Sequence, residues 1–480
     1  MTDSHASYSG PELCQLEAHE VVALLQKGDV SSAELLDASR QRVEAVDPVV
    51  NAMPTVCWER AKSASENMDP SGSSGFGWLG GLPLGIKDLN AVAGVRSTWG
   101  TQGLSDFVPT TSDPLVVRIE DRGGLVVGKT NSPEFGAGGN TFNDVFGPTF
   151  NPWDTTLNAG GSSGGAAVSL ATGEVWLSHG SDHGGSLRTP AAYCGIVGLR
   201  PTPGRAGGSS VDQAFMIEGV QGPMARSVTD CALFLDTMSG FDPTSPISYP
   251  APETSYFEAV GTPNEKPRIA FSLDLGGFGA VDKEMAEHLS ATLATLESNG
   301  AVVEEISFDA SKLDSTYHTL RGMMWATGAK LLSAKTTKHL KKTIKENTEF
   351  GEALTMSDIG DAQITRSRLF AQMTELFKDF DVLALPVVGC MPHAQSEEWV
   401  SDIGGQKLSG YMDWLRFAFL ATTTSLPAMS VPVGLGPRRL PVGLQLIGKP
   451  RDEAGLLQIA RFVELSMGGP MKPIDPIVMQ

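Results

Sequence analysis

Cysteine is scarce in this 480-residue sequence, and its five copies lie far apart without a CxxC pair. Closely spaced cysteines supply most structural zinc sites, and a dense, even-numbered set marks the disulfide frameworks of small secreted proteins. The sequence has neither pattern. We therefore expect five reduced thiols in packed positions, no disulfides and no zinc site.

Long apolar runs are missing as well. An uncharged stretch such as residues 417–436 contains threonines and prolines, which argue against a helix that spans lipid. The first ten residues, MTDSHASYSG, contain neither the basic start nor the apolar segment of a secretory signal. These features predict a cytoplasmic protein that makes no contact with a membrane.

Positive charge is in deficit, because 36 Lys+Arg against 55 Asp+Glu give a formal net charge of −19. A chain of this sign repels phosphate backbones unless basic residues gather locally, and only a short lysine run within residues 330–345 does so. We therefore expect no nucleic-acid partner. A hydrophobic fraction of 41% with 19% charged residues excludes disorder and coiled coil.

Glycine and proline are plentiful, with 54 and 30 copies, which is typical of a chain with many tight turns. Apolar periodicity predicts helices and strands that alternate along the chain. The expected helices are 11–27, 31–46, 113–123, 227–238, 280–300 and 453–467, and the expected strands are 82–90, 123–131, 266–274, 301–308, 381–388, 428–435 and 441–448. The pattern indicates an α/β fold, with a plausible boundary in the proline-rich residues 242–253 and a mostly helical cap or insertion at 311–380.

Two short motifs have a plain structural interpretation that we favour. GGLVVGKT, at 123–130, fits the phosphate-loop expression around Lys129, but Leu125 to Val127 read as a buried strand rather than a loop. GSSGG, at 161–165, fits a nucleophile elbow centred on Ser163, but no strand precedes it. The downstream histidines His318, His339 and His393 offer no recognisable base for that serine.

A metal site at His179 and His183 is also disfavoured. Their spacing of four would suit two ligands on one helix, but the glycines around them argue against a helix.

Three further segments form a larger constellation: GLPLGIKDLN around Lys87, NAGGSSGGAAV around Ser162, and GSDHGGSLRTPAA around Ser186. Two glycine- and serine-rich clusters separated by an apolar segment are unlike a linker. We interpret them as two loops folded around one site, where glycine allows main-chain N–H groups to come close to a ligand.

With Ser186 placed 24 positions after Ser162, these motifs closely resemble those of the amidase signature family of serine hydrolases. GPMARSVTDCALFLD and the C-terminal LPAMSVPVG and LPVGLQLIG extend the resemblance over most of the chain. The resemblance implies one α/β/α domain over residues 1–480, with a mixed, mostly parallel sheet wrapped by helices and its signature region at about 80–240. It also implies hydrolysis of small-molecule amides without a cofactor or metal.

The resemblance further implies a role for each motif residue. Ser186 would be the nucleophile, Ser162 a bridging serine that follows a cis peptide bond, and Lys87 the base. A charged lysine cannot accept a proton, so Lys87 needs a lowered pKa, which burial would supply. Asp88 would oppose that shift if its carboxylate pointed inward.

The remaining site residues follow from the same motifs. Backbone N–H groups of His183, Gly184, Gly185 and Ser186 would form the oxyanion hole, with Ser163, Asp182 and Arg188 in support. The family usually has a small residue where His183 stands. Its side chain therefore either shapes the wall beside the hole or faces solvent without a role.

Two other functions stay open. One is the role of the amidase component in a glutamine-dependent, tRNA-linked amidotransferase, and the other is that of a non-catalytic binding protein that kept the fold. The substrate is not fixed by the sequence, and Arg321, Trp325 and Trp414 are candidate pocket-wall residues. A homodimer is an open alternative to a monomer.

Overall fold

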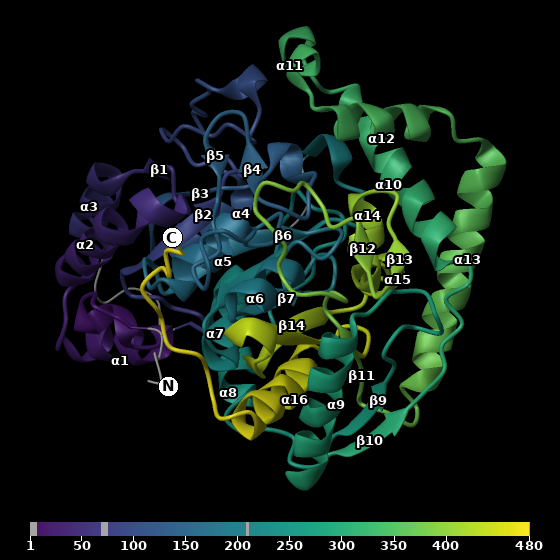
Figure 1. The fold of residues 1–480 in the computed structure, drawn as a ribbon. Coiled ribbons are helices and arrows are strands. Elements are labelled where there is room, and N and C mark those ends of the chain that lie inside the picture. Colours follow the sequence, from purple (N-terminus) through teal and green to yellow (C-terminus); the bar gives the residue numbers. More distant parts are fainter. Residues whose placement is uncertain (1–6, 69–74, 208–210, 480) are drawn as a thin grey trace.

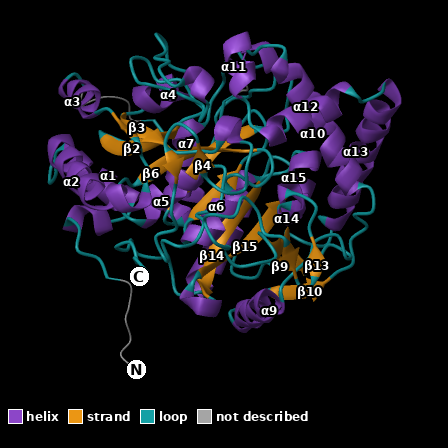
Figure 2. Ribbon diagram, turned by 45° about the horizontal axis from the view of Figure 1, so that its top comes forward, coloured by secondary structure: helices purple, strands orange, loops and turns teal. Residues whose placement is uncertain are grey.

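The computed structural model describes residues 7–68, 75–207 and 211–479, and an 11-stranded sheet runs through them with helices on both sides (Figures 1 and 2). Its strands are β1 (Thr55–Val56), β2 (Leu82–Lys87), β3 (Gly124–Thr130), β6 (Leu177–Asp182), β7 (Val197–Arg200), β8 (Val220–Ala225), β9 (Arg268–Phe271), β10 (Val302–Glu305), β11 (Val382–Pro386), β14 (Ala428–Leu435) and β15 (Pro441–Gly448). Their order is β1-β3-β2-β6-β8-β7-β14-β15-β11-β9-β10. Two small hairpins, β4 (Phe142–Asn143) with β5 (Gly147–Pro148) and β12 (Asp402–Ile403) with β13 (Gln406–Lys407), lie outside it.

The predicted mixed sheet is confirmed, and its parallel ladders lie on the two flanks. They join β3, β2 and β6 on one side and β11, β9 and β10 on the other. The strands between them, from β6 through β15 to β11, pair antiparallel. The short connection from β14 to β15 explains part of this, because parallel neighbours need a longer crossover.

Most predicted helices are confirmed, including those over the polar region 311–380. The helices are α1 (Ala18–Lys27), α2 (Ser32–Val50), α3 (Trp58–Glu66), α4 (Pro114–Asp121), α5 (Gly164–Ala171), α6 (Arg188–Cys194), α7 (Val228–Met238), α8 (Tyr256–Ala259), α9 (Lys283–Ser298), α10 (Leu313–Ala329), α11 (Ala334–His339), α12 (Lys342–Glu352), α13 (Met356–Leu376), α14 (Tyr411–Trp414), α15 (Phe419–Thr424) and α16 (Glu453–Ser466). Sequence reasoning missed the short helices α3, α6, α8, α14 and α15.

The helix expected over 11–27 is shorter, because a separate 3₁₀ turn occupies Glu12–Gln15 and α1 starts at Ala18. Asp230 of α7 contacts that start by accepting hydrogen bonds from the backbone N–H groups of Ala18 at 2.7 Å and His19 at 2.9 Å. These are orphan donors of a helix N-terminus, which an acidic group stabilises. A contact from α7 therefore stabilises the start of α1, together with the capping box formed by Glu17 and Glu20.

The strands nearest the site are completely buried. Every residue of β2, β3 and β15 is buried, as is every residue of α5. Continuous apolar or small residues in these segments match elements covered on all sides. The carboxyl ends of β2 and β6 and the start of α5 therefore meet inside the protein.

The five cysteines are free thiols, as predicted, and four of them are buried. Among the described residues, no helix has both the length and the apolar character needed to cross a bilayer.

Candidate active site

Lys87 ends β2 inside the protein and is surrounded by hydroxyl groups. Its side chain is 0% exposed, and its Nζ donates to the Oγ atoms of Ser162 at 2.7 Å, Ser163 at 2.9 Å and Ser181 at 3.0 Å. Burial lowers the pKa of Lys87 to about 7, and Asp182 opposes this shift only in part. A sizeable fraction of Lys87 is therefore neutral at neutral pH and able to accept a proton.

Asp88, next to Lys87, points to a different part of the core. Its carboxylate accepts the N–H of Thr98 at 3.0 Å and pairs with Nζ of Lys129 at 3.1 Å. Asp88 therefore does not raise the pKa of Lys87, as it would if its carboxylate pointed toward that lysine. Lys129 itself lies in the buried strand β3, which confirms the strand interpretation of GGLVVGKT over a phosphate loop.

Ser162 and Ser163 lie between a tight glycine turn and α5. The peptide bond between Gly161 and Ser162 is cis, as the family resemblance implied. The N–H of Ser163 donates to the carbonyl of Ser186 at 3.2 Å, which joins the two glycine-rich loops. A Cβ on Gly161 would lie 2.9 Å from the carbonyl oxygen of Gly138, so only glycine fits there.

Ser186 is 9% exposed and lines the same cavity as Ser162. Within the described residues, its hydroxyl makes no hydrogen bond to another side chain. The structure thus brings the Lys87–Ser162 pair together, while the Ser162–Ser186 bond of the expected relay is not formed. Catalytic hydrogen bonds are often long or absent until substrate binds.

Asp182, at the end of β6, shapes the loop that carries Ser186. Its carboxylate accepts the N–H groups of Gly185 and Leu187, each at 3.1 Å, and is paired with Arg188 at 2.8 Å. Burial alone would raise the pKa of Asp182, but Arg188 and Arg200 hold it well below its usual range. The carboxylate is therefore charged and holds the turn in one conformation.

The predicted oxyanion donors differ in availability. The N–H of Gly185 is already donated to Asp182, so it is not free for a substrate oxygen. The N–H groups of His183, Gly184 and Ser186 donate to no group in the described part of the chain. A Cβ on Gly184 would lie 2.7 Å from the Tyr317 hydroxyl, which explains a glycine at that position.

His183 is half-buried and its Nε2 is shielded from solvent, so the solvent-facing alternative is wrong. Its Nδ1 lies 3.0 Å from the Tyr317 hydroxyl, and the two rings meet edge to face. Burial, together with the charges of Arg321 and Arg200, holds the pKa of His183 well below its usual value. The neutral imidazole therefore forms part of the wall beside the oxyanion loop.

Two cavities meet at this loop. One of about 300 Å³ is mostly apolar and contains Ser162, Ser186, Arg321 and Trp325 in its lining. The other, of about 450 Å³, includes Asp113, Asp182 and Asp242 in its lining. Both cavities are lined by six shared residues: Leu89, Ser181, His183, Gln213, Gly219 and Met324.

Of the three predicted wall residues, Trp414 lines neither cavity. It is buried in the core, stacks on Tyr193, and donates its Nε1 to the Tyr193 hydroxyl at 3.2 Å. Trp414 needs no ligand contact, because its ring is packed in the core and its Nε1 already donates a hydrogen bond.

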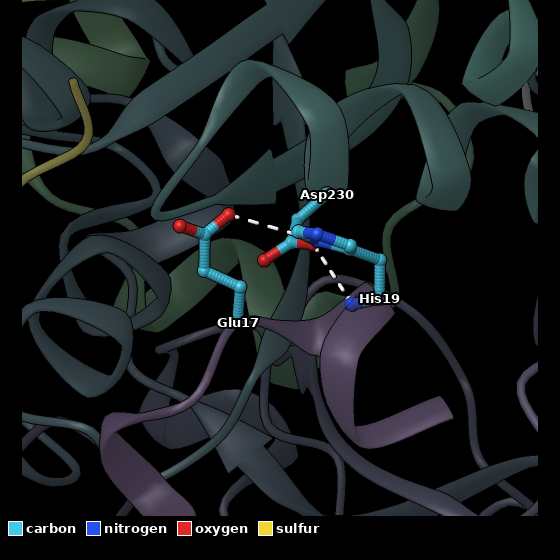
Figure 3. A group of neighbouring side chains, drawn as sticks. All are labelled: Glu17, His19 and Asp230. Atoms are coloured by element: carbon cyan, nitrogen blue, oxygen red, sulfur yellow. Dashed lines mark hydrogen bonds and ion pairs between the residues drawn. The ribbon is translucent and has the colours of Figure 1, made fainter. Parts of the chain in front are cut away.

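The expected lack of a metal site at His179 fits its surroundings. Its Nε2 lies 2.6 Å from the Gln221 amide oxygen, and burial lowers the pKa of His179 to about 3. Across the described ranges, the one cluster of at least three possible ligands is Glu17, His19 and Asp230 (Figure 3). Asp230 uses both carboxylate oxygens on the start of α1, so the cluster has a structural role.

Three residues of the site were given no role by sequence reasoning: Ser181, Tyr317 and Gln445. Gln445 accepts a hydrogen bond from Arg188 and donates to the carbonyl of Phe417 at 2.9 Å. A lone polar residue inside the apolar, fully buried β15 was the available signal for it. Ser181 and Tyr317 had no comparable signal, since serine and tyrosine are common on strands and helices.

Comparisons with known proteins agree with this geometry. Residues 34–457 match a family model described as Amidase. An acylamidase from Rhodococcus erythropolis is 34% identical over 470 residues, which cover 97% of this chain and 98% of that protein. A glutamyl-tRNA(Gln) amidotransferase subunit of Anaeromyxobacter dehalogenans (strain 2CP-C) is 33% identical over 500 residues, covering 97% and 99%.

Solved structures are similar over the same length. A bacterial aryl acylamidase of the amidase signature enzymes superposes with a TM-score of 0.86 at 25% identity, covering 95% of this chain and 99% of that one. 6-Aminohexanoate cyclic dimer hydrolase, in complex with substrate, gives a TM-score of 0.85 at 27% identity, covering 95% and 98%.

Proposed function

The chain belongs to the amidase signature family, whose members hydrolyse carbon–nitrogen bonds of carboxylic amides, and we propose that it does so through an acyl-enzyme on Ser186. One observation carries this proposal. Lys87 is fully buried, its hydrogen bonds within the described residues go to serine hydroxyls, and its pKa is lowered to about 7. A lysine in this environment is suited to be a base rather than a structural cation.

In the first step, neutral Lys87 takes the proton of Ser162, and Ser162 takes the proton of Ser186 as the Ser186 Oγ attacks the amide carbon. This relay requires the Ser186 hydroxyl to turn toward Ser162 when substrate is bound. The carbonyl oxygen becomes negative and is stabilised by the N–H groups of His183, Gly184 and Ser186. Each such donor typically contributes about 3 kcal/mol to transition-state stabilisation.

In the second step, the tetrahedral intermediate collapses and the C–N bond breaks. The proton held by Lys87 returns through Ser162 to the leaving nitrogen, which departs as an amine or ammonia. Water then attacks the Ser186 ester, giving up a proton by the same route, and the acid is released as the Ser186 hydroxyl is restored. Ser163, Asp182 and Arg188 hold the two loops in place throughout.

A fluorophosphonate probe tests the nucleophile directly. We expect the probe to add covalently to Ser186, as read by peptide mass spectrometry, and Ser186→Ala to lose both labelling and amide hydrolysis while keeping its fold. Labelling of another serine, or full activity of Ser186→Ala, would overturn the assignment. Absence of any labelling in the folded protein would favour the non-catalytic binding protein instead.

The second candidate function is that of an amidotransferase component, since several relatives carry that name at up to 33% identity. We propose independent action on a small-molecule amide instead, because the acylamidase is equally similar at 34% and the net charge of −19 disfavours RNA contact. The purified chain alone should hydrolyse simple amides faster than glutamine. Glutaminase activity that requires added partner proteins would support the other candidate.

We further propose that residues 1–480 act as one amidase domain, because a single 11-stranded sheet draws strands from residue 55 to residue 448. Five free thiols are compatible with the cytoplasm, which stays our proposed location. The homodimer stays a prediction, which sedimentation equilibrium would test.

A further inference from the structure

Arg321 is a buried cation in the wall of the catalytic cavity. It lies on α10, is 5% exposed, and lines the cavity that contains Ser162 and Ser186. Among the ion pairs of the described residues, none joins its guanidinium to a carboxylate. Arginine is rarely buried without an anionic partner, because desolvating its charge is costly.

The groups that do surround Arg321 are neutral. Its Nε donates to the amide oxygen of Asn347 at 3.3 Å, and its Nη2 donates to the Tyr411 hydroxyl. The rings of Trp325 and Tyr411 lie 5.6 and 5.7 Å from the guanidinium carbon. These contacts hold the side chain in position but compensate its positive charge only in part.

Most other buried arginines of this protein are paired with a carboxylate, whereas Arg226 donates to the main-chain carbonyls of Leu16 and Val175 and lines no part of the catalytic cavity. Arg188 lies 2.8 Å from Asp182, and Arg42 lies 2.8 Å from Asp475. Both arginines are in the packed interior and neither lines the catalytic cavity. Arg321 therefore differs from them both in lacking an acidic partner among the described residues and in facing a space that a ligand can enter.

Arg321 is also close to the reacting groups. It follows Tyr317 by one helical turn on α10, and residues at that spacing lie about 6 Å apart. The Tyr317 hydroxyl lies 3.0 Å from Nδ1 of His183, beside the loop that carries Gly184 and Ser186. Ser186 and Arg321 line the same cavity of about 300 Å³, so a small molecule with its amide at Ser186 can reach Arg321.

We propose that the substrate is a carboxylic amide that also carries a carboxylate, which Arg321 binds while Ser186 attacks the amide. The guanidinium fork matches a carboxylate in shape and donates charge-assisted hydrogen bonds to it. Apolar wall residues such as Leu89, Phe135 and Leu332 suit a hydrocarbon segment between the two groups. This inference rests on the proposed amide hydrolysis, and it names the class of substrate for the same site.

The carboxylate has two possible places in the substrate, and the experiment covers both. One arm uses mono-anilides of linear dicarboxylic acids with increasing numbers of methylene groups, each compared with the uncharged straight-chain acyl anilide of equal length. The other arm uses N-acyl ω-amino acids, each compared with the N-acyl alkylamine. The readout is the ratio of kcat/KM for the charged substrate to that for its neutral partner.

For the wild-type protein, we expect this ratio to reach roughly 10- to 100-fold in one arm, the range of hydrogen bonds to charged groups. Arg321→Met should remove the preference, and Arg321→Lys should retain part of it. Arg416→Met is the matched control, because Arg416 is paired with Asp413 at 2.9 Å and lines neither cavity. Its ratio should equal that of wild type. If the Met variant does not fold, the Lys variant supplies the same comparison.

Two results would overturn the inference. One is a wild-type kcat/KM ratio of one or less for every pair of charged and neutral substrates. The other is that Arg321→Lys or Arg321→Met lowers kcat/KM equally for the charged and the neutral substrate of a pair. These outcomes are distinct from failure of the proposed function. If neutral amides are hydrolysed and Ser186 is labelled by the fluorophosphonate, only the carboxylate preference has failed. If no amide in either arm reacts and Ser186 is not labelled, the hydrolytic function itself has failed.

Discussion

Two fully buried lysines lie on neighbouring strands of the sheet and have opposite environments. Lys87 ends β2, and Lys129 lies in β3, where it is paired in register with Ile86. Both are 0% exposed. Nζ of Lys129 lies 3.1 Å from the Asp88 carboxylate, 2.7 Å from the Asn90 carbonyl and 2.8 Å from the Ser97 hydroxyl, whereas Nζ of Lys87 donates to serine hydroxyls.

Burial lowers the pKa of both lysines, and their partners account for the difference in role. At Lys129 the adjacent Asp88 counteracts burial, which favours the charged ammonium. At Lys87 the opposing charge is that of Asp182, which is already engaged by Arg188, and the pKa falls to about 7. The presence or absence of one adjacent carboxylate therefore separates a structural cation from a base.

Lys87→Met should give the largest effect, a fall of roughly 10⁴-fold in kcat/KM, because it removes the base from the relay. Stability should not fall, since a buried amine without a counter-ion is replaced by an apolar side chain of similar length. Amide hydrolysis and urea unfolding measure the two effects. Activity within tenfold of wild type would show that Lys87 is no more catalytic than Lys129.

Lys129→Met should cost stability instead, by about 3–5 kcal/mol, because it leaves the Asp88 carboxylate buried without its partner. Urea unfolding monitored by tryptophan fluorescence provides the measurement. The double variant Lys129→Met with Asp88→Asn is the control, and it should regain part of the loss. Equal stability of Lys129→Met and wild type would contradict the structural role.

The activity of the wild-type protein should depend on pH through Lys87. Below its pKa of about 7 the lysine is protonated and cannot act as a base, so kcat/KM should fall by roughly tenfold for each further pH unit. Above that value the rate should level off. A profile that stays flat well below neutral pH would mean that another group accepts the proton.

Ser181→Ala should have the smallest effect, a loss of a few-fold in rate, since one neutral hydrogen bond contributes about 1 kcal/mol. The Ser181 oxygen accepts a hydrogen bond from Lys87 at 3.0 Å and so favours the charged ammonium. Its removal should lower the pKa of Lys87 further and move the rising part of the pH profile to lower pH. Ser178→Ala, on the same strand but bonded to the carbonyl of Gly85 instead of Lys87, should leave the profile in place.

Much of the fold was predictable because local patterns are strong in it. Amphipathic periodicity identified α2, α9 and α16, and short apolar runs identified β2, β3 and β15. The helix α6 was not found, because it has only 7 residues, contains Pro190 and is buried on every side, which leaves no polar face to detect. The strand order also depends on distant pairings that no local pattern contains.

The site was predictable where chemistry needs fixed residue types in fixed motifs. Lys87, Ser162 and Ser186 come from such motifs, and the structure brings the first two into contact. The engagement of the Gly185 N–H by Asp182 and the neutral surroundings of Arg321 were not predictable. Both depend on side-chain directions set by packing among segments far apart in the sequence.

The sheet order has a consequence for how this chain is made. The last two strands, β14 and β15, lie between β7 and β11 and join the two flanks of the sheet. Until both strands are synthesised, nothing joins the two flanks within the sheet, and Arg188 lacks its Gln445 partner. Translation therefore reaches its final tenth before the catalytic loop has its full support, and a truncated chain exposes edges prone to aggregation.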